Sequence, residues 1–99
     1  MILEHAILDV DPAEAAAYEQ ALRKALPLIA ATPGFIRLTV RPCLEKQGRY
    51  LLLVEWRDLA DHTQGFRQSA RYAEWKSLLH RFYRPFPEVE HYGEPIAAA

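Results

Sequence analysis

The sequence predicts one α+β domain whose elements follow in the order β-α-β-β-α-β, and three observations lead to that prediction. Residues 2–10, 35–41 and 51–56 have the apolar patterns of strands. Two longer stretches, after the first and third of these, repeat apolar residues every three or four positions, as amphipathic helices do. A last strand-like stretch, residues 88–92, follows two prolines that would stop the second helix.

The first strand has two different faces, as expected for a strand in the centre of a sheet. One face carries Ile2, Ala6, Leu8 and Val10. The other face carries Leu3, His5, Ile7 and Asp9. Asp11 then supplies the N-cap of the first helix, with a proline directly after it.

The first helix is predicted from one apolar stripe. Its members are Tyr18, Leu22, Ala25 and Ile29. Pro27 falls inside this pattern and predicts a kink or an end of the regular helix near residues 24–26. The Thr-Pro-Gly sequence at residues 32–34 predicts a turn that closes the segment.

The second and third strands are predicted to form a hairpin. The apolar face of the second strand carries Ile36, Leu38 and Val40. Its mixed face carries Phe35, Arg37, Thr39 and Arg41. Residues 42–49 are polar and would connect it to an antiparallel partner. That partner, residues 51–56, is apolar on successive positions, which is typical of a strand covered on both faces.

The second helix is predicted to begin at Asp58 and to bend in its middle. One stripe consists of Leu59, His62, Phe66 and Ser69. A second stripe consists of Tyr72, Trp75, Leu79 and Phe82. Gly65 weakens the helix between them, and Ser69 can cap a new segment that begins near Ala70.

This element order is the ferredoxin-like, or split βαβ, arrangement. Right-handed crossovers place the first and third strands side by side in the centre of an antiparallel sheet, with both helices on one face. The other face still carries Leu3, Ile7 and Phe35, and no third helix exists to cover them. Because monomers rarely expose such a patch, we expect a homodimer. Residues 1–93 form the predicted domain, and residues 94–99 a flexible tail.

Composition excludes several function classes. The net charge of −1, with both signs interspersed, argues against a surface for nucleic acid or for anionic membranes. Cys43 is the only cysteine, so no intrachain disulfide forms and a reducing compartment is expected. The first residues lack the pattern of a signal peptide, and no run is long enough to span a membrane. We therefore expect a soluble cytoplasmic protein.

The most distinctive sequence patterns are VEW at residues 54–56, DH..GFR.S..Y..W at residues 61–75 and FPEVEHY at residues 86–92. With them, the chain resembles the antibiotic biosynthesis monooxygenase family over residues 2–92. The resemblance implies a dimeric α+β barrel and oxygenation of an aromatic or quinol-like small molecule without a cofactor. In such chemistry the substrate becomes an electron-rich anion, and the protein supplies an apolar pocket, a base and exclusion of water.

Two alternatives accompany this interpretation. Related haem-degrading proteins use a helix histidine as iron ligand and an asparagine on the first strand. In this chain His5 falls near the position of that asparagine, and Trp75 and Lys76 fall near that of the histidine, so haem degradation is the weaker reading. The other alternative is a non-catalytic dimeric module that binds a small molecule or a protein partner.

His62 is the first candidate for a catalytic base. It shares a helix face with Phe66, and the pKa of histidine lies close to working pH. The alternative is a partly exposed helix histidine that only packs its ring and bonds a neighbour. His5 is the second catalytic candidate. It would meet His91 if the first and last strands pair in register, but no close ligand spacing supports a metal site there.

The sequence also predicts an apolar pocket between the sheet and the two helices. Its expected lining residues are Tyr18, Leu22, Leu53, His62, Phe66, Tyr72 and Trp75. Phe66, Tyr72 and Trp75 are the candidates for contact with a substrate ring, although such a stripe is also typical of a core. Arg37 is a candidate for binding a substrate anion, and an ion pair with Glu55 or Glu90 is its alternative.

Overall fold

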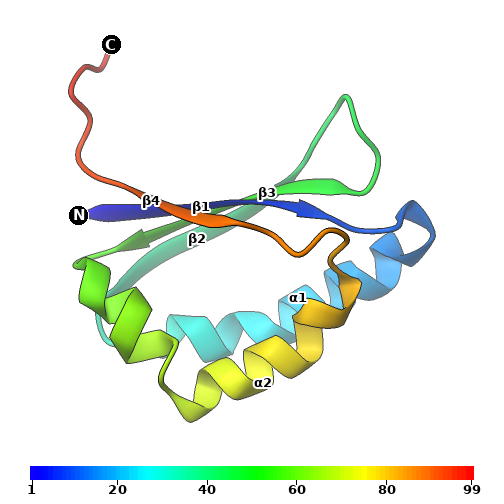
Figure 1. The fold of residues 1–99 in the computed structure, drawn as a ribbon, viewed down its shortest axis with the longest axis horizontal. Coiled ribbons are helices and arrows are strands. Elements are labelled where there is room, and N and C mark those ends of the chain that lie inside the picture. The colour runs from blue at the N-terminus through cyan, green and yellow to red at the C-terminus, as the bar shows by residue number, and fades with distance from the viewer.

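The computed structural model describes residues 1–99 as one antiparallel sheet with both helices on one of its faces (Figure 1). The elements are β1 (Ile2–Asp9), η1 (Pro12–Glu14), α1 (Ala15–Ala30), β2 (Phe35–Pro42), β3 (Arg49–Trp56), η2 (Asp61–Phe66), α2 (Ala70–Leu79), η3 (His80–Phe82) and β4 (Val89–Tyr92). The strand order is β2-β3-β1-β4, so β1 and β3 are central. The predicted ferredoxin-like fold is confirmed. None of its helices has the length and apolar character needed to cross a membrane.

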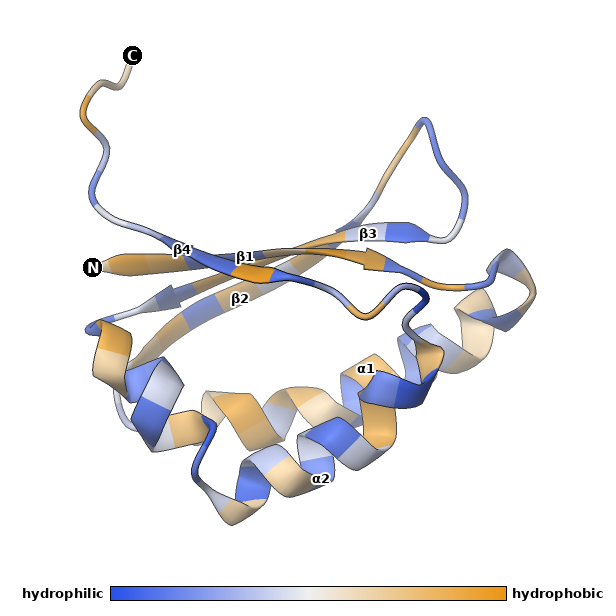
Figure 2. Ribbon diagram, in the orientation of Figure 1, coloured by the Kyte–Doolittle hydropathy of each residue, from blue (hydrophilic) through white to orange (hydrophobic).

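The hydrophobic core lies between the helices and the inner face of the sheet. The central strands contribute Ala6, Leu8, Tyr50, Leu52, Val54 and Trp56 to it. The predicted stripe of α1 is confirmed, since all four of its residues are buried. Figure 2 shows hydrophobic residues along α1 and in the strands that it faces. The outer face of the sheet has no helix over it (Figure 1).

The helical connection between β1 and β2 begins as predicted, but its helix ends later than predicted. Asp11 accepts a hydrogen bond from the Ala13 amide at 3.0 Å. The predicted end of the helix near residues 24–26 is wrong, because α1 continues through Pro27 to Ala30. Pro27 removes one amide donor from the helix without stopping it. Gly34 then turns the chain with a φ of 88°, and a Cβ there would clash with the Asp61 carboxylate.

A bulge in β2 changes which residues face the core. The register between β2 and β3 shifts between Phe35 and Arg37. Phe35 pairs with Trp56, and the two rings meet edge to face at 5.8 Å. The prediction that Phe35 lies on the outer face is therefore wrong. Strict alternation fails there because a bulge inserts one unpaired residue.

The second helical region is broken at the predicted position. Ser69 accepts a hydrogen bond from the Tyr72 amide at 3.2 Å and begins α2 at Ala70. Asp58 was predicted to begin the second helix. Instead of its side chain capping the helix, its backbone amide donates to the Asp61 carboxylate at 3.0 Å.

The segment η2 is wound as a π-helical turn and not as an α-helix. The Arg67 amide donates to the His62 carbonyl oxygen, five residues back, at 3.0 Å. Such turns are frequent at functional sites. Within η2, His62 and Phe66 are buried, whereas the first member of the predicted stripe, Leu59, lies before η2 and is 45% exposed. The π turn therefore directs only part of that stripe toward the sheet.

Candidate functional site

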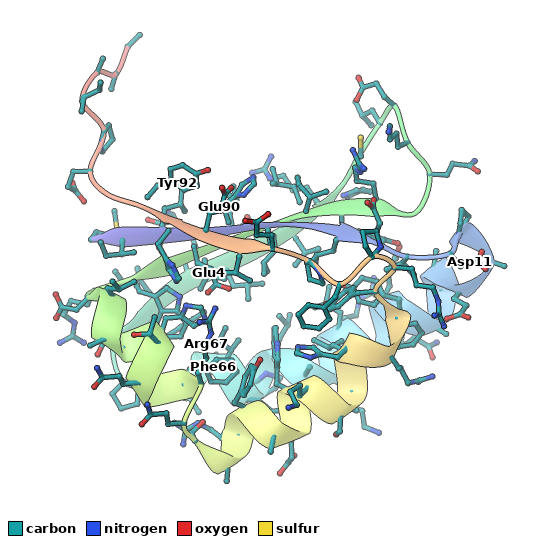
Figure 3. All side chains as sticks on the ribbon, in the orientation of Figure 1. Glu4, Asp11, Phe66, Arg67, Glu90 and Tyr92 are labelled. Carbon is teal, nitrogen blue, oxygen red and sulfur yellow. The ribbon has the colours of Figure 1, made fainter.

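A cavity of about 390 Å³ lies between the inner face of the sheet and the second helical region. Its polar lining residues are Glu4, His62, Arg67, Tyr72, His80 and Tyr83. Its apolar lining residues come from β1, β3, η2 and α2, and also from α1, β4 and the segment just before β4. Figure 3 shows Glu4 on the sheet side of this space and Phe66 and Arg67 on the η2 side. The cavity therefore combines an apolar, aromatic wall with a small polar group of side chains.

The predicted pocket matches this cavity only in part. Four of the expected residues line it, namely His62, Phe66, Tyr72 and Trp75. Tyr18, Leu22 and Leu53 do not. Leu53 pairs with His5 and lies on the outer face of the sheet. Tyr18 packs against Tyr50 and Phe82 in the core, with ring centroids 5.1 and 5.5 Å away.

His62 lies deep in the protein, at the end of the cavity next to the sheet. Only 3% of its surface is exposed, so the partial exposure assumed in the alternative interpretation is wrong, whereas the packed ring and bonded neighbour of that interpretation are present. Its ring stacks on Trp56 with the centroids 5.2 Å apart. Its Nδ1 is 2.8 Å from Nε2 of His91, and its Nε2 is 3.4 Å from Oε1 of Glu4. Both ring nitrogens therefore face a titratable side chain.

Glu4 is a buried carboxyl group that the sequence interpretation missed. It is 5% exposed, and its Oε1 accepts a hydrogen bond from Trp56 Nε1 at 2.9 Å. Burial raises the pKa of Glu4, and this effect exceeds the lowering by the Trp56 hydrogen bond and by the charge of Arg67. The available signal was its position, since Glu4 alternates with Ile2 and Ala6 on an otherwise apolar strand face.

The two histidines of the site are neutral at neutral pH. Burial lowers the pKa of His62 to about 3, and the charge of Arg67 and then the neighbouring His91 act in the same direction. Burial, followed by the charge of Arg67, also lowers the pKa of His91. A neutral imidazole has one nitrogen that donates and one that accepts, so a single proton lies between these two rings.

Arg67 brings an uncompensated positive charge to the cavity. Its side chain lines the space but takes part in none of the ion pairs or side-chain hydrogen bonds of the protein. The residue is exposed, so its guanidinium group is free to reorient. A guanidinium beside an apolar cavity is well suited to hold an oxygen anion. Arg67 was also missed, because a single arginine after a helical turn carries no local signal.

The other predicted site residues lie on the opposite side of the sheet. His5 pairs with Glu90, whereas His91 pairs with Glu4. The prediction that His5 and His91 share one space is therefore wrong, because their side chains point to different faces. Arg37 forms an ion pair with Glu55, which was its alternative reading, and does not line the cavity. No group of three or more His, Cys, Asp or Glu side chains is arranged to hold a metal ion.

Comparison with known proteins gives a consistent result. The family model of antibiotic biosynthesis monooxygenases matches residues 1–78. The uncharacterized protein YczJ from Bacillus subtilis is 49% identical over 94 residues, which are 95% of this chain and 99% of YczJ. A solved structure of a candidate antibiotic biosynthesis monooxygenase from Bordetella bronchiseptica is 30% identical, with a TM-score of 0.89 over 96% of this chain and 97% of that one.

A more distant structure shares the fold. SnoaB from Streptomyces nogalater, described as a cofactor-independent oxygenase, is 19% identical to this chain. The two superpose with a TM-score of 0.69, over 98% of this chain and 94% of SnoaB. At this identity the likeness establishes the α+β fold alone.

Proposed function

This chain belongs to the antibiotic biosynthesis monooxygenase family, and on that premise we propose that it is a cofactor-independent monooxygenase. Its proposed substrate is an aromatic small molecule with a phenol- or quinol-like hydroxyl group. The observation that carries the proposal is the buried Glu4–His62 pair at the end of a cavity with aromatic walls. The description of SnoaB as a cofactor-independent oxygenase supports it by analogy.

The proposed reaction begins with removal of the hydroxyl proton. A phenol has a pKa of about 10, so it needs both a base and stabilisation of the anion. Glu4 and His62 supply the basic group, and Arg67 would hold the resulting oxygen anion. Phe66, Tyr72 and Trp75 would pack against the ring and exclude water.

The electron-rich anion then reduces dioxygen by one electron, and the two radicals combine at a ring carbon. The peroxide formed takes up a proton and loses water, which leaves a carbonyl group on that carbon. The substrate supplies all the electrons, so the protein needs only to bind, deprotonate and shield it.

The test is oxygen consumption by an unsupplemented protein. The protein is incubated under anaerobic conditions with a panel of hydroxynaphthalenes and anthrones, and air is then admitted in an oxygen electrode. We expect uptake well above the rate of spontaneous oxidation without protein. Tight binding without uptake would contradict the enzyme and favour the second candidate, a non-catalytic binding module with the same cavity.

We further propose that two copies pack through the outer faces of their sheets. That face carries apolar side chains with no cover, among them Leu3, Leu51 and Leu53, and Ile7 is 38% exposed. Burial of such a patch drives association. Light scattering at micromolar concentration should give the mass of a dimer, and Ile7→Glu should give that of a monomer. A monomeric wild-type protein would contradict this arrangement.

A further inference from the structure

Rapid deprotonation needs a way for the proton to leave the buried end of the cavity, where Glu4 and His62 are only 5% and 3% exposed. On the basis of the proposed function, we propose that Glu4, His62 and His91 form a proton relay from the cavity to the edge of the sheet. In this relay Glu4 takes the proton of the substrate, His62 passes it on, and His91 releases it to water. The proposal therefore assigns the role of base to Glu4, with His62 as the intermediate.

The three side chains come from separate elements and meet in a row. Glu4 on β1 and His91 on β4 are cross-strand partners, so they lie on the same face of the sheet. His62 from η2 lies between them, with Nε2 3.4 Å from Glu4 Oε1 and Nδ1 2.8 Å from His91 Nε2. Glu4 and His62 line the cavity, whereas His91 does not. Since β4 is an edge strand and His91 is half-buried, the row ends where water can reach it.

The contacts among Glu4, His62 and His91 favour Glu4 over His62 as the side chain that accepts the proton of the substrate. The His62 Nδ1 is engaged with His91, and its Nε2 lies 3.4 Å from Glu4 Oε1, so both nitrogens have a protein side chain beside them. Oε1 of Glu4 accepts from Trp56, but Oε2 accepts no hydrogen bond from the protein. That second oxygen is the basic atom left for a hydroxyl group in the cavity. The raised pKa of Glu4 makes it a stronger base than an exposed carboxylate.

The proton balance closes without charging either imidazole. The relay requires that, before transfer, Glu4 is ionised and His62 and His91 each carry their proton on Nδ1. The substrate proton reaches Oε2 of Glu4, and rotation of the carboxyl group turns the protonated oxygen toward His62. The proton then moves to His62 Nε2, while the His62 Nδ1 proton moves to His91 Nε2. The His91 Nδ1 proton then leaves to water. One proton has left the cavity, and both rings have changed tautomer while remaining neutral.

The return of a proton restores the starting state. The peroxide formed later in the proposed reaction needs one proton, which the same row can deliver in reverse, from water through His91 to Glu4. After this delivery both rings again carry the proton on Nδ1. The charged groups around the row are Glu4 from β1 and Arg67 after η2, and the positive charge of Arg67 favours neutral imidazoles. Trp56 from β3 contacts the His62 ring without a charge of its own.

The experiment measures proton release without oxygen. The protein is mixed anaerobically with 1-naphthol in weak buffer with an indicator dye, and the absorbance of bound naphtholate and that of the dye are followed together. His91→Gln should slow proton release roughly tenfold or more, with the affinity for naphthol unchanged, because the amide cannot pass a proton. Glu90→Gln is the matched control, since this neighbour points to the other face of the sheet. In His91→Gly, added imidazole should restore the rate.

Release from His91→Gln at the wild-type rate, or no rescue by imidazole, would overturn the relay. Proton release by the wild type without later oxygen uptake would retain the relay and reject the monooxygenase. If naphthol does not bind or a variant does not fold, ¹⁵N spectra of the wild-type imidazole rings decide. His62 should then carry its proton on Nδ1, and a proton on Nε2 in the ligand-free protein would refute the proposed order.

Discussion

Replacing Glu4 with glutamine should lower oxygen-consuming turnover roughly a hundredfold or more while leaving the folded state at least as stable as before. Glutamine has the shape of glutamate and keeps an oxygen that can accept the Trp56 indole N–H, which lies 2.9 Å from Glu4 Oε1. It cannot take a proton from a phenol. Contacts between the ring of the substrate and Phe66 or Trp75 are untouched, so substrate affinity should change little.

The expected gain in stability follows from the raised pKa of Glu4. Burial raises this pKa from its ordinary value of 4.5, so the folded state binds the proton more tightly than the unfolded state. The stabilisation by the protonated carboxyl is complete below the unfolded pKa and is lost as pH rises through the folded pKa. Above that range an ionised carboxylate sits in an apolar site, whereas glutamine is neutral at every pH.

Urea unfolding at several pH values and the oxygen electrode together test this prediction, and the stability of Glu4→Gln relative to the wild type should grow as pH rises. Glu55→Gln serves as the control, because this strand glutamate pairs with Arg37 on the outer face. If Glu4 only supported the structure, its replacement should lower the stability and the activity of the protein together. Unchanged turnover in Glu4→Gln, or a marked loss of stability, would contradict the role of Glu4 as a buried base.

The element order could be predicted because its signals are local. Ser69 begins a new helical segment, and its side chain accepts the predicted hydrogen bond from Tyr72. The stripe of α1 from Tyr18 to Ile29 was also correct, since helical spacing alone determines which side chains share a face. These features depend on neighbours within a few residues.

The candidate site could be predicted only in part, because its contacts join distant parts of the chain. The pairing of Glu4 with His91 depends on the register of β4, which no pattern within residues 88–92 determines. The bulge that turns Phe35 inward depends on the partner strand. The burial of His62 depends on a π turn whose extra residue has no sequence signature. The sequence therefore identified the aromatic residues Phe66, Tyr72 and Trp75 of the cavity. It did not identify Glu4 and His91, the strand residues that contact His62.

Replacing His62 with glutamine should remove a steep dependence of stability on pH. The pKa of His62 falls to about 3 in the folded state, against an ordinary value of 6.5. The stabilisation by the neutral ring is complete above the unfolded pKa and is lost as pH falls through the folded pKa. Between these values only the unfolded state binds the proton, so the free energy of unfolding drops by about 1.4 kcal/mol per pH unit on acidification.

The variant should also be less stable at neutral pH, by about 1–3 kcal/mol, because His91 loses a buried partner and Trp56 loses a stacked ring. Urea unfolding from about pH 7 down to about pH 5 measures both effects, and the slope of the wild type minus that of the variant isolates His62. Subtraction matters because the lowered pKa values of His80 and His91 add to the wild-type slope, while the raised pKa of Glu4 opposes it.

Phe66→Leu separates loss of packing from loss of titration. This residue lies in the same cluster as His62 and carries no charge, so its shortening should lower stability by a similar amount at every pH. The slope of Phe66→Leu should therefore match that of the wild type. If His62→Gln also kept the wild-type slope, the His62 ring would be protonated as readily in the folded state as in the unfolded one. A ring of that kind would be charged below its ordinary pKa. The proposed relay needs His62 and His91 to change tautomer while both stay neutral, so this result would contradict it.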